Sequence, residues 1–254
     1  MRARLALAAI GLMLALPVMA ADYVALPGGS FTSVLPADGK AATAELAPFL
    51  LRTTLVTNAD FLAFVQTHPR WRRDRVASIL ADQRYLTQWG SADALGDGVL
   101  PRQPVTRVSW FAAQAYCESE GARLPTWYEW EYAAAADGTR RDARADPAWR
   151  ESILGWYARP SNVALPVVGG VANAYGVRDM NGLVWEWVDD FNALMVASDS
   201  RQQGDPDLLK FCGAGAISMQ EKENYAVLMR IAMLSALKAA NTTNNMGFRC
   251  AKSE

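Results

Sequence analysis

Two tryptophans separated by one glutamate close the stretch Asp179-Met-Asn-Gly-Leu-Val-Trp-Glu-Trp187. Asp179 lies seven residues before Glu186, and Gly182 stands between them, where a chain turns readily. Two large aromatic side chains this close together favour burial in a core, whereas the two acids need a cation or hydrogen-bond donors. The stretch therefore predicts a tight turn that carries aromatic residues into the core.

The first twenty residues have the parts of a secretory signal. Arg2 and Arg4 form a basic start, an apolar run follows, and the small residue Ala20 stands where signal peptidase cleaves. An uncleaved membrane anchor is the alternative, although the apolar run is short of the roughly 20 residues that a span needs. We therefore expect a cleaved signal over residues 1–20, export to the periplasm, and one domain over residues 21–254.

Charge and cysteine content limit the classes of function. The chain has 25 basic and 26 acidic residues, which does not favour nucleic acid as a partner, and no further apolar run favours a membrane. The basic cluster at residues 70–75 is interrupted by Asp74 and is typical of a solvated helix face. Export permits disulfides, and three cysteines leave at least one thiol free if one pair closes: Cys117, Cys212 and Cys250.

Capping patterns predict three helices. Each begins after a Ser or Thr whose side chain can accept from backbone amides, and two of these residues are followed by an acid that completes a capping box. The predicted helices begin after Thr57, Ser109 and Thr126 and run to about residues 67, 120 and 136.

Residues 139–225 lack such patterns. They are rich in Gly, Pro, Asn and Asp between short apolar pieces, which favours short strands and long ordered loops. Long loops are uncommon in compact domains unless something staples them, and the candidates are a disulfide, a bound ion and the nine tryptophans. The opening residues 23–31 are typical of short strands joined by a glycine turn.

Other blocks accompany the tryptophan–glutamate–tryptophan stretch in order along the chain. The most specific are Arg123-Leu-Pro-Thr126 with Glu129-Trp-Glu-Tyr-Ala133, and the ending Gly247-Phe-Arg-Cys250. With residues 56–65 and 104–110, they resemble the formylglycine-generating enzyme family, also called sulfatase-modifying factors. The resemblance covers roughly residues 23–252 and implies an α+β fold of low regularity, related to C-type lectins.

The resemblance also implies how the cysteines are used. The family's helix and C-terminal cysteines are joined in some members, which implies a Cys117–Cys250 disulfide rather than two free buried thiols. Members that generate formylglycine bind copper(I), a soft ion, through two thiolates. Counted back from Gly247 without gaps, those positions are Glu221 and Ala226, which cannot bind copper(I). Copper-dependent oxidation of a substrate cysteine is therefore not expected.

Other relatives hold non-haem iron with several histidines and act in thiohistidine synthesis. This chain has a single histidine, His68, which fits a surface or helix-capping role. No copper or iron site is therefore evident in the sequence.

Family members also bind structural calcium, partly through the turn described first, and calcium prefers six to eight oxygen ligands. Asp179, the carbonyl of Gly182 and Glu186 match ligand positions, but Leu183 replaces the family's usual asparagine and offers no side-chain oxygen. The alternative is that backbone amides hold Glu186 while the flanking tryptophans fill the core. The positions implied for a second, weaker calcium site are Asn162 and Val163.

Three residues on the segment that normally lines the family's cleft are catalytic candidates: Cys212, Glu221 and Arg230. A reactive thiol needs exposure and a lowered pKa, and the apolar neighbours of Cys212 favour a buried free thiol instead. Arg230 fits either of two roles, holding an anionic group of a ligand or holding a core carboxylate.

The retained fold blocks and the missing metal cysteines predict an accessory or maturation factor that binds another periplasmic protein. Residues 225–249 resemble an exported subgroup encoded with copper nitrite reductases, which implies a role in denitrification. One alternative is a periplasmic oxidase or tailoring enzyme that uses other cleft residues. A lectin-like ligand-binding module is a third alternative, which rests on fold analogy alone.

Overall fold

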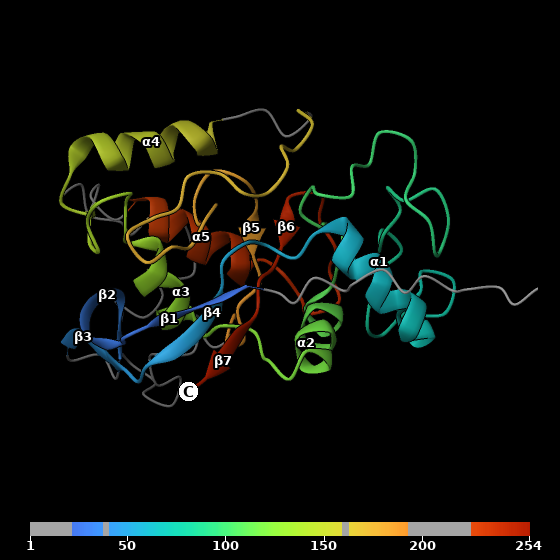
Figure 1. Ribbon diagram of the computed structural model, residues 1–254, viewed down its shortest axis with the longest axis horizontal. Helices are drawn as coiled ribbons and strands as arrows, with labels where there is room; N and C mark the ends of the chain where they lie inside the picture. Colours follow the sequence, from blue (N-terminus) through green and yellow to red (C-terminus); the bar gives the residue numbers. More distant parts are fainter. Residues whose placement is uncertain (1–21, 38–40, 159–162, 193–224) are drawn as a thin grey trace, which may run out of the picture.

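The computed structural model describes residues 22–37, 41–158, 163–192 and 225–254 (Figure 1). Its helices are α1 (Asn58–Thr67), the 3-10 helix η1 (Pro69–Trp71), α2 (Trp110–Ser119), α3 (Trp127–Ala134), α4 (Pro147–Tyr157) and α5 (Tyr225–Ser235). Its strands are β1 (Tyr23–Leu26), β2 (Gly29–Ala37), β3 (Ala41–Leu46), β4 (Phe49–Arg52), β5 (Trp185–Glu186), β6 (Met246–Gly247) and β7 (Ala251–Ser253). Separate helices beside small sheets make the fold α+β, and none of the described helices has the length and apolarity to cross a membrane.

The main sheet joins the two ends of the described chain. β4 lies between β1 and β7 and is antiparallel to both, with Leu26 opposite Phe49 and Leu51 opposite Ala251 (Figure 1). The expected glycine turn follows β1, where Gly28 has a φ of 65° and a Cβ would stand 2.3 Å from the carbonyl oxygen of Leu46. Only glycine fits this position, since it lacks the Cβ and adopts positive φ freely.

The three predicted helices are confirmed as α1, α2 and α3. Thr57 and Thr126 form complete capping boxes, and the Ser109 side chain accepts from the amide of Ala112. The third helix ends at Ala134, two residues before the predicted end. Local hydrogen bonds at the N-termini explain why these starts are predictable from the sequence.

One other expectation is confirmed in part, and another is wrong. In the described part of residues 139–225, the loops over 163–184 and the short strand β5 agree with the expectation, but the range also contains α4, which begins with Asp146 as N-cap and Pro147 in the first turn. The basic cluster at residues 70–75 lies on η1 and turns instead of a solvated helix face. Arg72 there pairs with Asp74 in an exposed contact at 3.1 Å.

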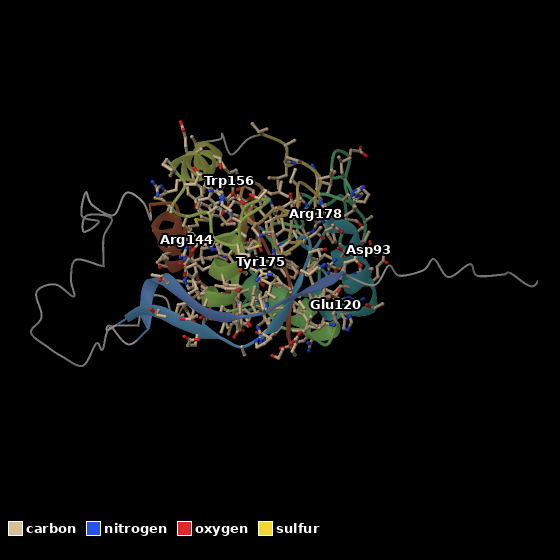
Figure 2. All side chains as sticks on the ribbon, turned by 60° about the vertical axis from the view of Figure 1, so that its left-hand side comes forward. Asp93, Glu120, Arg144, Trp156, Tyr175 and Arg178 are labelled. Carbon is tan, nitrogen blue, oxygen red and sulfur yellow. A yellow bond between two sulfur atoms is a disulfide. The ribbon has the colours of Figure 1, made fainter. Side chains whose placement is uncertain are left out.

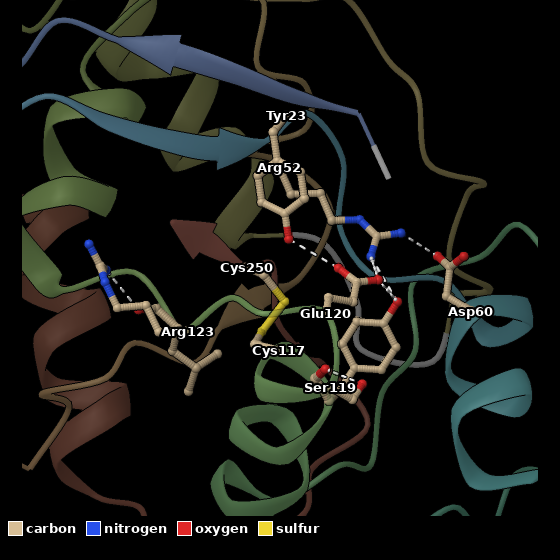
Figure 3. The surroundings of a disulfide bond; sticks show 10 residues. Tyr23, Arg52, Asp60, Cys117, Ser119, Glu120, Arg123 and Cys250 are labelled. Carbon is tan, nitrogen blue, oxygen red and sulfur yellow. Dashed lines mark hydrogen bonds and ion pairs between the residues drawn. A yellow bond between two sulfur atoms is a disulfide. The ribbon is translucent and has the colours of Figure 1, made fainter. Parts of the chain in front are cut away.

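A disulfide joins Cys117 of α2 to Cys250 beside β7, in agreement with the pairing that the resemblance implies (Figure 3). Both residues are fully buried, and the bond closes a separation of 133 residues. In the chain-entropy model a loop of this length stabilises the fold by up to about 4–5 kcal/mol. The bond therefore fixes the C-terminal strand against the middle of the chain.

Candidate functional site

The tryptophan–glutamate–tryptophan stretch and the C-terminal Gly-Phe-Arg block meet in the core. β5 pairs in parallel with β6, so that Trp185 lies opposite Met246 and Glu186 lies opposite Gly247. A Cβ on Gly247 would stand 2.9 Å from the carbonyl oxygen of Val105 and push that segment away. Blocks that are far apart in the sequence therefore form one packed centre, and its close approach requires glycine.

Glu186 and Arg249 form an ion pair in this centre, and neither side chain is exposed. Arg249 donates from Nε to Oε2 of Glu186 at 2.7 Å and from Nη2 to Oε1 at 2.9 Å. This bidentate geometry gives strong, charge-assisted hydrogen bonds. A guanidinium holds Glu186, so the alternative in which backbone amides hold it is wrong, although Trp187 does fill the core.

Arg230, on α5, lies in the same centre with only 2% of its surface exposed. Its Nη2 donates to the backbone carbonyl of Glu186 at 2.6 Å, and its guanidinium carbon stands 3.5 Å from the ring centroid of Trp130. Burial lowers the pKa of Arg230 to about 10, which still leaves it charged at neutral pH. Among the described residues no carboxylate forms an ion pair with Arg230, and its Nε has no hydrogen-bond partner.

Aromatic side chains from α4 and β5 stack beside Arg230. The rings of Tyr157 and Trp185 are nearly parallel with centroids 4.9 Å apart, and Trp156 packs on Trp185 at 5.2 Å (Figure 2 labels Trp156). All three are half-buried. Burial raises the pKa of Tyr157 to about 12, and the charge of Arg230 opposes that shift. The stack thus lies within electrostatic range of the guanidinium, between the core and the surface.

The residues implied as calcium ligands have other partners. Asp179 has a φ of 57°, and its carboxylate accepts from the amides of Gly169 at 2.7 Å and Gly170 at 3.0 Å. Glu186 faces the guanidinium of Arg249 with both oxygens, and a cation at that place would repel a dication. As arranged here, Glu186 does not fit a calcium ligand.

No group of three or more His, Cys, Asp or Glu suited to a metal occurs in the part of the chain that the structure describes. Of the positions implied for the second calcium site, Val163 is 63% exposed. Calcium stays a prediction for both sites. The predicted site residues that lie outside the described ranges are Asn162, Cys212 and Glu221.

His68 takes the helix-capping place that the sequence suggests. It is the C-terminal cap of α1, and its ring stacks on Phe64 with centroids 4.7 Å apart. This contact accounts for the single histidine as part of the helix end.

Sequence reasoning missed most of the surroundings of Arg230. It does place Trp127 and Trp130 on one helix face, and that face packs on Arg230. The guanidinium carbon of Arg230 stands 5.6 Å from the ring centroid of Trp127 and 3.5 Å from that of Trp130. Tyr157 belongs to the unpredicted helix α4, for which the Asp-Pro pair at residues 146–147 was an available start signal. Arg249 was seen only as part of a family block, because its partner Glu186 is 63 residues away.

The similarity to known proteins extends over most of the chain. The family model described as sulfatase-modifying factor enzyme 1-like domain matches residues 11–254. The chain is 30% identical over 282 residues to the formylglycine-generating enzyme of Streptomyces coelicolor, covering 90% of this chain and 88% of that protein. It is 29% identical over 273 residues to the inactive C-alpha-formylglycine-generating enzyme 2 of Mus musculus, covering 91% of this chain and 85% of that protein.

Other relatives are more partial or more distant. The chain is 33% identical over 203 residues to the hercynine oxygenase of Mycolicibacterium smegmatis, covering 67% of this chain and 46% of that protein. Among solved structures, PvdO from Pseudomonas aeruginosa is similar with a TM-score of 0.49 at 21% identity, covering 91% of this chain and 94% of PvdO. Since the family model matches nearly the whole chain, the protein belongs to the sulfatase-modifying factor, or formylglycine-generating enzyme, family.

Proposed function

We propose that this protein is an exported, catalytically divergent family member that acts as an accessory or maturation factor for another periplasmic protein. One observation carries the proposal. The Cys117–Cys250 disulfide uses two of the three cysteines, which leaves Cys212 as the one remaining thiol in the sequence. With that pairing, the chain keeps fewer than the two protein thiolates that copper(I) would need, which supports the proposal.

The histidine content gives independent support against the iron chemistry of other relatives. His68 is the single histidine in the sequence, and its ring is stacked on Phe64 at the end of α1. A site of several histidines cannot be built from it. The Mus musculus relative, which is named as inactive, is an example of a family protein without the activity.

The proposal predicts the metal content of the exported protein. The chain would be secreted to the periplasm with its own signal and purified without added metals, followed by elemental analysis and oxygen uptake with a cysteine-containing peptide. We expect at most calcium, and no oxygen uptake. Stoichiometric copper or iron together with oxygen uptake would refute the proposal.

A role in denitrification is the finer form of the proposal. The gene would be deleted in its host, and nitrite reduction would be measured after complementation with the full chain or with a chain lacking residues 2–20. We expect nitrite reduction to fall and to return only with the full chain. Unchanged nitrite reduction would exclude denitrification and direct the search to another exported partner.

The enzyme alternative has less support. Of its three candidate residues, Arg230 is the one that the structure describes, and its guanidinium is held by the carbonyl of Glu186 and the ring of Trp130. If an activity is found, alanine at Cys212, Glu221 and Arg230 should abolish it. Retained activity in that triple variant would refute the assignment.

A further inference from the structure

Three charged side chains are buried together where β5, β6 and α5 meet. Glu186, Arg230 and Arg249 are each 2% exposed or less. Arg249 and Glu186 neutralise each other, so among the described residues Arg230 has no carboxylate of its own to balance its positive charge. Buried charges in folded proteins are normally paired, because water no longer solvates them.

Two buried hydrogen-bond donors at the same place also lack partners within the described ranges of the chain. The Nε of Arg230 and the Nε1 of Trp130 make no hydrogen bond, and the two side chains are in contact, with the guanidinium carbon 3.5 Å from the ring centroid. Neither group can accept a hydrogen bond. Only an acceptor from elsewhere satisfies them, and an anionic acceptor would also balance the charge.

The shape of the guanidinium limits the kind of anion. The ring of Trp130 covers one face of Arg230, and Nη2 is already bonded to the carbonyl of Glu186. An anion must therefore approach a remaining edge of the planar group, which is how a carboxylate binds arginine. The half-buried stack of Tyr157 and Trp185 lies within electrostatic range of this arginine.

We propose that Arg230 and Trp130 form a binding site for one carboxylate. The carboxylate belongs either to a small organic acid or to an acidic side chain of a partner peptide. The site does not depend on the accessory role, so failure of the test below leaves that role untouched.

The test compares thermal unfolding in sodium acetate and in sodium chloride at equal ionic strength. For the wild type, we expect acetate at a hundredfold excess over its Kd to raise Tm by on the order of 5–10 °C. R230M should lose this rise, whereas R70M should keep it. Arg70 is a matched control because it also stacks on a tryptophan ring, Trp71 at 5.4 Å, but is exposed.

The sign of the R230M effect adds a second criterion. In chloride, R230M should be at least as stable as the wild type, because it removes an unpaired buried cation, and in acetate the order should reverse. The proposal is overturned if acetate and chloride act alike on the wild type, or if R230M keeps the acetate effect. If R230M fails to fold, the acetate titration of wild-type tryptophan fluorescence decides, since a saturable change in acetate but not in chloride is required.

A last comparison separates the two sources of the carboxylate. A short peptide containing aspartate would be titrated beside its asparagine counterpart and beside acetate. A lower midpoint for the aspartate peptide than for acetate assigns the site to a partner peptide, and equal midpoints assign it to a small acid. An equal effect of sulfate would overturn the assignment to a carboxylate.

Discussion

Arg52 and Arg230 are both buried arginines, yet their surroundings differ. Arg52, at the end of β4, is 5% exposed and donates to Asp60 at 2.7 Å, to the hydroxyl of Tyr116 at 2.9 Å and to Glu120 at 3.2 Å (Figure 3). Arg230 is 2% exposed and has a backbone carbonyl and tryptophan rings instead. One guanidinium is fully engaged by side chains, and the other is not.

The difference appears in the two pKa values. Burial opposes the charge of Arg52, but Tyr116, Asp60 and Glu120 outweigh it and raise the pKa. Burial lowers the pKa of Arg230. The nearby Glu186 opposes that shift but does not outweigh it, and its carboxylate is bonded to Arg249. Depth in the core is therefore shared by the two arginines, whereas an opposite charge among the described residues is paired with Arg52 alone.

The largest expected effect comes from removing the pairing beside Arg230. In R249M, the carboxylate of Glu186 is left buried, and we expect a loss of about 3–5 kcal/mol in the free energy of unfolding, measured with urea. D74N, which breaks the exposed pair with Arg72, is the control and should leave the free energy of unfolding nearly unchanged, because water screens that pair. A loss below 1 kcal/mol in R249M would mean that Arg230 pairs with Glu186 once Arg249 is gone. No buried charge would then be left without an opposite partner in the variant.

The next effect concerns the region of Arg52. The amide of Arg52 donates to the carbonyl of Cys250 at 2.9 Å, and Tyr116 precedes Cys117, so the disulfide borders this cluster. The C117A/C250A double variant should lose about 2–5 kcal/mol of stability. Wild type treated with reductant should show a similar loss. If reductant leaves the unfolding midpoint unchanged, the disulfide does not stabilise the exported protein.

The two regions also show what the sequence can reveal. The starts of α1 and α3 are predictable because Thr57 and Thr126 bond to acids three residues ahead. α5 escapes prediction because its sequence is apolar on nearly every side, so no periodic stripe marks it, and Arg230 interrupts it as a buried charge.

The ion pairs lie beyond local patterns altogether. Asp60 is predicted as part of a capping box, but the same carboxylate also binds Arg52, eight residues earlier. Glu120 lies 68 residues from Arg52, and Glu186 lies 63 residues from Arg249. Such partners are set by how elements pack. The family blocks therefore mark the residues of the Glu186–Arg249 centre, but they do not show which acid each arginine pairs with.

A smaller effect is expected from Arg52 itself. In R52M, Asp60 and Glu120 lose their cation, but their side chains are 31% and 26% exposed, so water partly replaces it. We expect a loss of about 2–3 kcal/mol in urea unfolding, below that of R249M. E120Q, which keeps a side chain of the same shape, should lose less. A larger loss in R52M than in R249M would contradict this explanation, in which water reaches Asp60 and Glu120 but does not reach Glu186.

The smallest effect tests the outermost bond of the Arg52 cluster. Tyr23 donates its hydroxyl to Glu120 at 3.0 Å, while its ring lies under Lys252, a contact that phenylalanine preserves. Y23F should therefore cost about 1 kcal/mol from the hydrogen bond alone.

Burial, followed by the charge of Glu120, raises the pKa of Tyr23 above its usual value of 10. A pKa that is raised in the folded state adds stability that is complete below pH 10 and is lost as the pH rises through the folded-state pKa. The difference in free energy of unfolding between wild type and Y23F should therefore stay constant from pH 6 to about 9 and narrow above pH 10. A gap that widens there would show that the hydroxyl is not bonded to Glu120.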